Sequence, residues 1–233
     1  PPRSTLFPYT TLFRSFAGME RVSLVDYPGK VALALFTSSC NFDCAYCHNP
    51  ELKKSVEEKV GESEVFKYLD RRAALIDAVV ITGGEPTLRA DDLIPFVERL
   101  KAQFPTVLVK LDTNGWNSDI LREFLNVIDY VAVDLKSLNY EPFSTVNLKQ
   151  IQKSIELAKT FSTHEIRITM FPPYVPEKDF EELARICSGA SLVSIQQYRP
   201  VRGVCETTPY AGSVLKRFAD LLSDRVENVT VRE

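Results

Sequence analysis

Apolar and polar positions along the chain follow the pattern of strands that alternate with helices. The run VALALFT at 31–37 is almost entirely apolar, which is typical of a strand covered on both faces. Within 91–103 the apolar residues instead recur every three or four positions, which indicates one buried helix face. These two periods predict strands at 31–37, 78–82, 106–111, 130–134, 165–171, 192–197 and, shorter, 228–231, and helices at 62–72, 91–103, 118–127, 148–161, 177–187 and 211–223.

The alternation amounts to about six βα units, which implies a parallel sheet with right-handed crossovers. Six units are too few for an eight-fold barrel. The predicted fold class is therefore α/β, a partial TIM-like (βα)6 barrel with the parallel sheet inside and the helices outside. No linker or repeat divides 16–233, so we expect a single domain there.

Residues 1–15 do not fit this pattern. They repeat Thr-Leu-Phe at 5–7 and 11–13, and their mixture of Pro, Thr and Phe matches neither the helix nor the strand period. We interpret the segment as a non-native or disordered N-terminal stretch that stands outside the domain.

Composition narrows the function classes. The 233 residues are 45% hydrophobic and 25% charged, with a formal net charge of -3, as in ordinary globular proteins. No basic block suggests a nucleic-acid partner, and no apolar run reaches the ~18 residues of a membrane span. Five cysteines are an odd number, and no secretion signal is evident, so we expect a cytoplasmic protein whose cysteines bind metal.

Three of the cysteines crowd the loop after the first predicted strand: Cys40, Cys44 and Cys47 form C-x3-C-x2-C. Iron–sulfur cubanes normally take four thiolates, so three would leave one iron open to a further ligand. Three alternatives compete. His48 could complete a closed zinc site, the C-x-x-C-H spelling of 44–48 could attach a c-type haem in an exported protein, or the thiols could be inert and buried.

Three further polar loops follow strands: Gly83-Gly84-Glu85-Pro86, Asp-Thr-Asn-Gly at 112–115 and Asp-Leu-Lys at 134–136. Each alone is a common turn sequence. Parallel sheets, however, place their ligand sites at the carboxyl ends of the strands. Together with the cysteine loop, these loops predict one ligand site.

These residues carry a resemblance to the radical SAM (S-adenosylmethionine) superfamily, whose C-x3-C-x-φ-C motif matches Cys40, Cys44, Tyr46 and Cys47. More narrowly, the chain is similar to glycyl-radical-enzyme activases, and among them to activating proteins of anaerobic ribonucleoside-triphosphate reductases. The segments SLVDYPGK at 23–30 and CHNPEL at 47–52 carry this closer likeness.

The resemblance implies a [4Fe–4S] cluster held by the three cysteines, with SAM on the fourth iron. It implies that Gly83, Gly84 and Glu85 receive the SAM amino group, and that one electron releases a 5′-deoxyadenosyl radical. No catalytic residue beyond the cluster and SAM is implied. The remaining implied cofactor contacts are Tyr46, the aromatic motif residue; Asp112 and Thr113, beside the SAM carboxylate and ribose, where a monovalent cation can sit; and Lys136 and Arg167, near the same carboxylate.

The activity that the resemblance implies is abstraction of a hydrogen atom from a glycine of a partner glycyl radical enzyme. The closer resemblance implies that this partner is the anaerobic ribonucleotide reductase and that flavodoxin or ferredoxin is the electron donor. One alternative is a small-molecule enzyme of the 7-carboxy-7-deazaguanine synthase type, although His48 stands where that family has aspartate. Another is a non-catalytic zinc or iron–sulfur module.

Four residues outside these assignments also carry expectations. Ser39 stands where activases usually have glycine, a change that we expect to be tolerated. Cys187 is predicted to lie in the core and His164 at the surface, while Cys205 has no predicted role.

Overall fold

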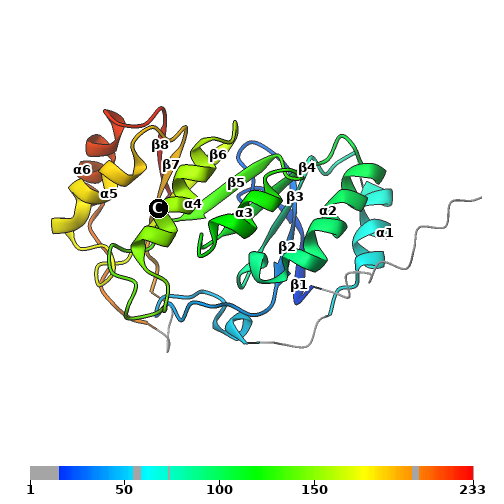
Figure 1. The fold of residues 1–233 in the computed structure, drawn as a ribbon, viewed down its shortest axis with the longest axis horizontal. Coiled ribbons are helices and arrows are strands. Elements are labelled where there is room, and N and C mark those ends of the chain that lie inside the picture. The colour runs from blue at the N-terminus through cyan, green and yellow to red at the C-terminus, as the bar shows by residue number, and fades with distance from the viewer. Residues whose placement is uncertain (1–15, 55–58, 73, 201–204, 233) are drawn as a thin grey trace, which may run out of the picture.

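The computed structural model describes residues 16–54, 59–72, 74–200 and 205–232. Segment 1–15 lies outside them, so its interpretation and the single-domain assignment of 16–233 stay predictions. One eight-stranded sheet runs through the described residues, with its strands in chain order (Figure 1). The strands are β1 (Gly18–Ser23), β2 (Ala32–Thr37), β3 (Ala78–Gly83), β4 (Leu108–Thr113), β5 (Tyr130–Asp134), β6 (His164–Met170), β7 (Val193–Gln197) and β8 (Val229–Arg232).

The helices connect parallel strands. Parallel pairing joins β2 through β8, whereas β1 lies antiparallel on β2. Within the described residues, no helix is both long and apolar enough to span a membrane. The helices are α1 (Glu62–Arg72), α2 (Ala90–Gln103), α3 (Ser118–Phe124), α4 (Leu148–Lys159), α5 (Phe180–Cys187) and α6 (Gly212–Ser223), with short 3-10 helices η1 (Pro50–Lys53), η2 (Pro86–Arg89) and η3 (Glu177–Asp179).

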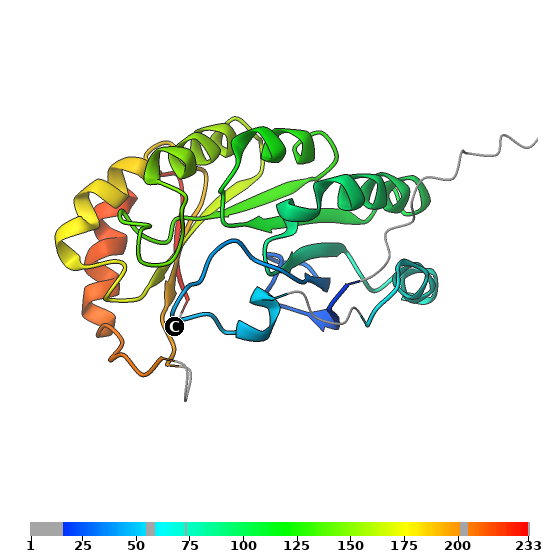
Figure 2. The same ribbon diagram turned by 60° about the horizontal axis from the view of Figure 1, so that its bottom comes forward.

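The sheet is a partial barrel. Figure 2 shows it curved, with α2 to α6 following its outer side. The two end strands are β1 and β8, so the curve stays open between them. Each of β2 to β7 leads into one helix, which confirms the predicted fold class of six βα units with outer helices.

Several elements differ from the prediction: η1 and η2 were not predicted, and the helix predicted at 118–127 ends at Phe124. The antiparallel strand β1 was not predicted, because its sequence GMERVS has no clear period of two and its residues 20–22 are exposed at the sheet edge. The helix predicted at 177–187 begins as the 3-10 helix η3 and becomes α-helical only at Phe180.

The prediction for His164 was wrong. The residue begins β6 and is only 6% exposed. Its Nε2 accepts a hydrogen bond from Ser191 N (3.0 Å), so its Nδ1 can donate to Phe161 O at 2.8 Å. The ring thus ties the end of the α4 connection to the start of β7, a role that a strand-flanking histidine does not reveal in the sequence. Cys187, by contrast, is fully buried as predicted.

The two faces of the sheet differ in chemistry, because successive side chains of a strand point to opposite faces. In β4, Val109 and Leu111 pack into the main hydrophobic core. Lys110 and Asp112 alternate with them and lie on the inner face, where the other strands place Glu165 and Arg167. The inside of the barrel therefore holds charged side chains beside a small apolar cluster that includes Ala34, Val80 and Tyr130, while helices cover its outside.

Candidate active site

A cavity of about 320 Å³ lies at the carboxyl ends of the strands. All eleven residues that the sequence suggested for the cluster and SAM line it, from Cys40 in the loop after β2 to Arg167 on β6. The structure thus brings the four predicted polar loops together. Lining residues not suggested by the sequence include Asp26, Lys53, Thr169 and Gln196.

The Gly83–Gly84 turn packs directly on the backbone of the cysteine loop. Gly84 N donates to Thr37 O and Glu85 N donates to Ser39 O, both at 2.8 Å. A Cβ on Gly84 would lie 2.0 Å from Ser39 O, and Gly83 adopts a φ of +113°. Glycine is therefore required at both positions, for close approach and for backbone conformation.

Ser39 has the left-handed φ of 70°, which side-chain-bearing residues adopt at a cost. This explains why glycine suits the position in activases. The serine is accommodated without a break in the loop, since its carbonyl still accepts from Glu85 N.

The three thiols of the motif are free and line the cavity from one loop. Phe42 N donates to Cys40 Sγ at 3.4 Å. Burial raises the pKa of Cys40 to about 11 and also raises that of Cys44. Because metal ligation needs thiolates, the metal itself has to displace these protons. Within the described residues, no three Cys, His, Asp or Glu side chains converge as a site for a metal ion.

Glu85 joins the loops after β2, β3 and β4. The residue is only 1% exposed. Oε1 accepts from Thr87 N (3.1 Å), Thr87 Oγ1 (2.5 Å) and Thr113 Oγ1 (2.7 Å), and Oε2 accepts from Asn114 N (2.7 Å). Burial raises the pKa of this carboxyl, and the hydrogen bonds oppose that rise. Since four donors already occupy the side chain, the backbone of the turn is the part of 83–85 that remains to meet an amino group.

A chain of alternating charges runs from the cavity along the inner face of the barrel. Arg167 occupies its centre, with Nε 2.7 Å from Asp134 Oδ1 and Nη1 2.7 Å from Asp112 Oδ2. Four cations alternate with three carboxylates along this chain, and its two cations that line the cavity, Lys136 and Arg167, are the groups there that suit an anionic ligand. In order, the members are Lys136, Asp134, Arg167, Asp112, Lys110, Glu165 and Arg232.

Asp112 is more enclosed than the sequence suggested. Lys110 Nζ lies 2.9 Å from its Oδ1, while Arg167 takes Oδ2. The monovalent cation expected there would thus be a third positive charge on the same carboxylate. The sequence contained one signal of this arrangement, since Lys110 interrupts an apolar strand two positions before Asp112 and so shares its face.

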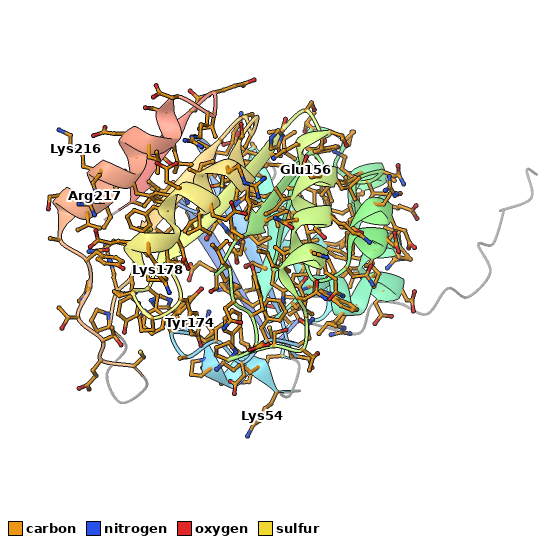
Figure 3. The ribbon with its side chains drawn as sticks, turned by 60° about the vertical axis from the view of Figure 1, so that its left-hand side comes forward. Lys54, Glu156, Tyr174, Lys178, Lys216 and Arg217 are labelled. Carbon is orange, nitrogen blue, oxygen red and sulfur yellow. The ribbon has the colours of Figure 1, made fainter. Side chains whose placement is uncertain are left out.

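Aromatic rings enclose the other side of the cysteine loop. Tyr46 lies 5.1 Å from Phe171, and Phe143 stacks on Tyr174 at 4.4 Å between centroids. Ala45 N donates to the Tyr174 hydroxyl at 3.2 Å; Figure 3 shows where Tyr174 lies. We call this group the aromatic shell, and its members are Phe42, Tyr46, Tyr140, Phe143, Phe171, Tyr174 and Tyr198.

Comparison with known proteins decides which chemistry this cavity serves. A family model described as the Radical SAM superfamily matches residues 35–187, a range that holds the cysteine loop and all the other predicted site residues. The chain belongs to the radical SAM superfamily. Radical SAM enzymes use a [4Fe–4S] cluster and SAM. Family membership therefore excludes the zinc, haem and inert-thiol interpretations of the cysteine motif.

Relatives narrow the assignment within the superfamily. A Methanocaldococcus jannaschii protein, itself only provisionally named a glycyl-radical enzyme activating enzyme, is 36% identical over 198 residues, which cover 79% of this chain and 80% of that protein. A Staphylococcus aureus pyruvate formate-lyase-activating enzyme is 29% identical over 183 residues, 69% of this chain and 70% of its own. This radical SAM chain is therefore an enzyme of the glycyl-radical-enzyme activating family.

Solved structures of other radical SAM proteins share the fold. A domain of a Bacteroides vulgatus pyruvate-formate lyase-activating enzyme matches with a TM-score of 0.54 and 20% identity, over 66% of this chain and 98% of that domain. Streptococcus suis SuiB bound to S-adenosylmethionine matches with a TM-score of 0.60 and 19% identity, over 84% of this chain and 48% of SuiB. At these identities the likeness concerns the fold alone.

The residues of the cavity fit the radical SAM cofactors. Three soft thiols on one loop suit iron. The buried rings of the aromatic shell cover one side of this loop and keep solvent from it. The Tyr46 hydroxyl is buried and has no hydrogen-bond partner in the described part of the chain, although it lines the cavity. Such a group is satisfied when a ligand fills the space. The individual contacts of the eight SAM residues stay predictions.

The charge chain predicts an acid-sensitive stability. Burial alone would raise the pKa of Asp134, but Arg167 and Lys136 outweigh it and lower that pKa from 3.8 to about 2. A lowered native pKa stabilises the fold above pH ~4, and this contribution disappears as the pH falls from there toward about 2. We expect the loss to be on the order of 2 kcal/mol for this group.

The measurement is the free energy of urea unfolding at pH 6, 5, 4 and 3 for wild type and Asp134→Asn. Above pH 5 the free energies of unfolding of the two proteins should change in parallel with pH. Below pH 4 the free energy of unfolding of the wild type should fall more steeply than that of the variant. If the free energy of unfolding depends on pH equally in both proteins over the whole range, Asp134 is not the source of the acid sensitivity.

Proposed function

We propose that this chain activates an oxygen-independent ribonucleotide reductase by removing a hydrogen atom from a backbone glycine of that partner. When bound, the cluster and SAM supply the adenosyl radical that takes this hydrogen. The observation that carries the proposal is the convergence of all predicted cluster and SAM residues on one cavity in a barrel whose end strands are unpaired with each other. An open barrel suits a substrate that is a segment of another protein.

The segment SLVDYPGK, which carries the closer resemblance, lies at this cavity. Asp26 lines it, and the Asp26 carbonyl accepts from Lys110 Nζ at 2.7 Å. Tyr27 packs edge-to-face on Tyr130 at 5.2 Å. The preceding residues Leu24 and Val25 are 73% and 74% exposed. Exposed apolar side chains that directly precede a cavity-lining residue in the sequence support a protein partner.

The protein's own residues would act by binding and by exclusion. Lys136 would hold the SAM carboxylate, and the backbone of 83–85 would hold its amino group. The aromatic shell would keep water from the cysteine loop. A flavodoxin or ferredoxin would deliver the electron, and the five free cysteines suit a reducing cytoplasm.

The test pairs the anaerobically reconstituted enzyme with candidate partners. Enzyme, SAM and a low-potential reductant are incubated with an anaerobic ribonucleotide reductase, with a pyruvate formate-lyase, or with neither. We expect a glycyl radical signal in electron paramagnetic resonance and matching 5′-deoxyadenosine only with the reductase. A signal confined to pyruvate formate-lyase would reassign the partner, and 5′-deoxyadenosine coupled only to a small molecule would favour the deazaguanine-type alternative.

A further inference from the structure

Lys53 holds the backbone of the first two cysteines of the motif, Cys40 and Cys44, although its side chain belongs to none of the predicted contacts. It is the last residue of η1. Its backbone carbonyl accepts from Cys40 N at 3.2 Å, and its Nζ donates to the Cys44 carbonyl at 2.8 Å. The backbone register of η1 therefore fixes the ammonium group beside the loop that carries the three thiols.

The charge partner of Lys53 is placed asymmetrically. Lys53 Nζ lies 2.6 Å from Asp43 Oδ1. The Lys53 side chain is 20% exposed and lines the cavity, whereas that of Asp43 is 85% exposed. Solvent and salt screen the exposed carboxylate much more than the enclosed ammonium. The pair therefore presents a net positive field to the sulfurs, although its formal charges cancel.

Lys136, the other ammonium of the cavity, is placed differently. Its partner Asp134 is only 22% exposed and lies within 2.9 Å, so that pair is screened evenly. Lys53 is thus a cation at the cysteine loop whose counter-charge lies in solvent, unlike that of Lys136.

We infer that Lys53 raises the reduction potential of the cluster. Reduction adds one negative charge to a cluster that three thiolates already make electron-rich. A nearby ammonium lowers the energy of the reduced state more than that of the oxidised state, and net charge is one of the factors that set such potentials. Lys53 is a tuning and positioning residue, since it holds the loop and acts on the cluster through space. The inference rests on the superfamily cofactor and is independent of which protein is the partner.

The experiment is a potentiometric titration of the reconstituted full chain, with the reduced cluster followed by electron paramagnetic resonance. In Lys53→Gln we expect the ratio of reduced to oxidised cluster at a fixed potential to fall about tenfold, a negative shift of about 59 mV for a one-electron couple. Lys53→Arg should keep the wild-type potential. Lys54→Gln is the matched control, because Lys54 is exposed and points away from the molecule in Figure 3.

The variant Asp43→Asn should shift the reduction potential in the direction opposite to Lys53→Gln. Its amide oxygen can still accept from Lys53, so the loop keeps its geometry while the ammonium loses its counter-charge. The potential should then shift in the positive direction. An unchanged potential in Lys53→Gln, or shifts of the same sign in Lys53→Gln and Asp43→Asn, would overturn the inference. If Lys53→Gln fails to retain iron, the positive shift of Asp43→Asn and the unchanged value of Lys53→Arg still decide it.

Discussion

Replacing Cys40, Cys44 or Cys47 singly by alanine is expected to abolish SAM cleavage and to strip most of the iron from the protein. The three thiols line one cavity from one loop, and a cubane that already has an open iron does not tolerate the loss of a second ligand. The measurements are iron and sulfide per chain after anaerobic reconstitution, and 5′-deoxyadenosine formed with a strong reductant. The expected loss of activity is complete within detection.

The controls are Cys187→Ala and Cys205→Ala. Cys187 is fully buried in the core, so its replacement costs stability while the cluster is retained. Cys205 lies near Thr207 Oγ1, 3.6 Å from its sulfur, and outside the cavity lining. Iron close to four atoms per chain in Cys44→Ala, or its loss in Cys205→Ala, would show that the ligand set is wrong.

Replacing Glu85 by alanine is expected to lower the free energy of unfolding by about 3–5 kcal/mol. The change leaves four buried donors without an acceptor, each of which loses its bond to a charged group. Glu85→Gln should be milder, at about 1–3 kcal/mol, because one oxygen remains while an amide nitrogen faces a donor. Glu98 on α2 is exposed, so Glu98→Ala should stay within about 0.5 kcal/mol of wild type.

The single tryptophan of the chain reports on this site directly. Trp116 Nε1 donates to Thr87 Oγ1 at 2.8 Å, one bond away from Glu85. Urea unfolding followed by tryptophan fluorescence and by circular dichroism therefore separates local from global effects. A Glu85→Ala protein as stable as Glu98→Ala, with unchanged fluorescence, would show that the carboxylate does not hold the loops together.

The sequence predicted the parallel core and the positions of its polar loops, because each depends on local patterns. Strand β3 reads as an apolar run that ends at Gly83-Gly84, and topology then brings Asp112 and Arg167 to the same sheet edge. The partners of these side chains depend on non-local registry. That Glu85 would be saturated by Thr87, Thr113 and Asn114 follows from contacts 28 and 29 positions apart as well as local ones.

Other features were hidden because their residues look ordinary out of context. Lys110 and Glu165 appear in strands as charges that could face solvent, yet both are buried on the inner face of the barrel. The aromatic shell draws rings from loops that have no period, such as Phe143 and Tyr174. Neither a propensity nor a motif marks a loop aromatic that stacks on a residue thirty-one positions away.

In the described part of the chain, every strand of the sheet pairs only with strands adjacent to it in sequence order. During synthesis the sheet can therefore grow one βα unit at a time, without waiting for a distant segment. The hydrogen bonds to the Glu85 side chain are complete once Asn114 has been made. In the cysteine loop, however, Asp43 N donates to the Phe143 carbonyl and Ala45 N donates to the Tyr174 hydroxyl. Both acceptors belong to segments that are translated later. Two of the contacts that hold the iron-binding loop can therefore form only after these later segments have been made.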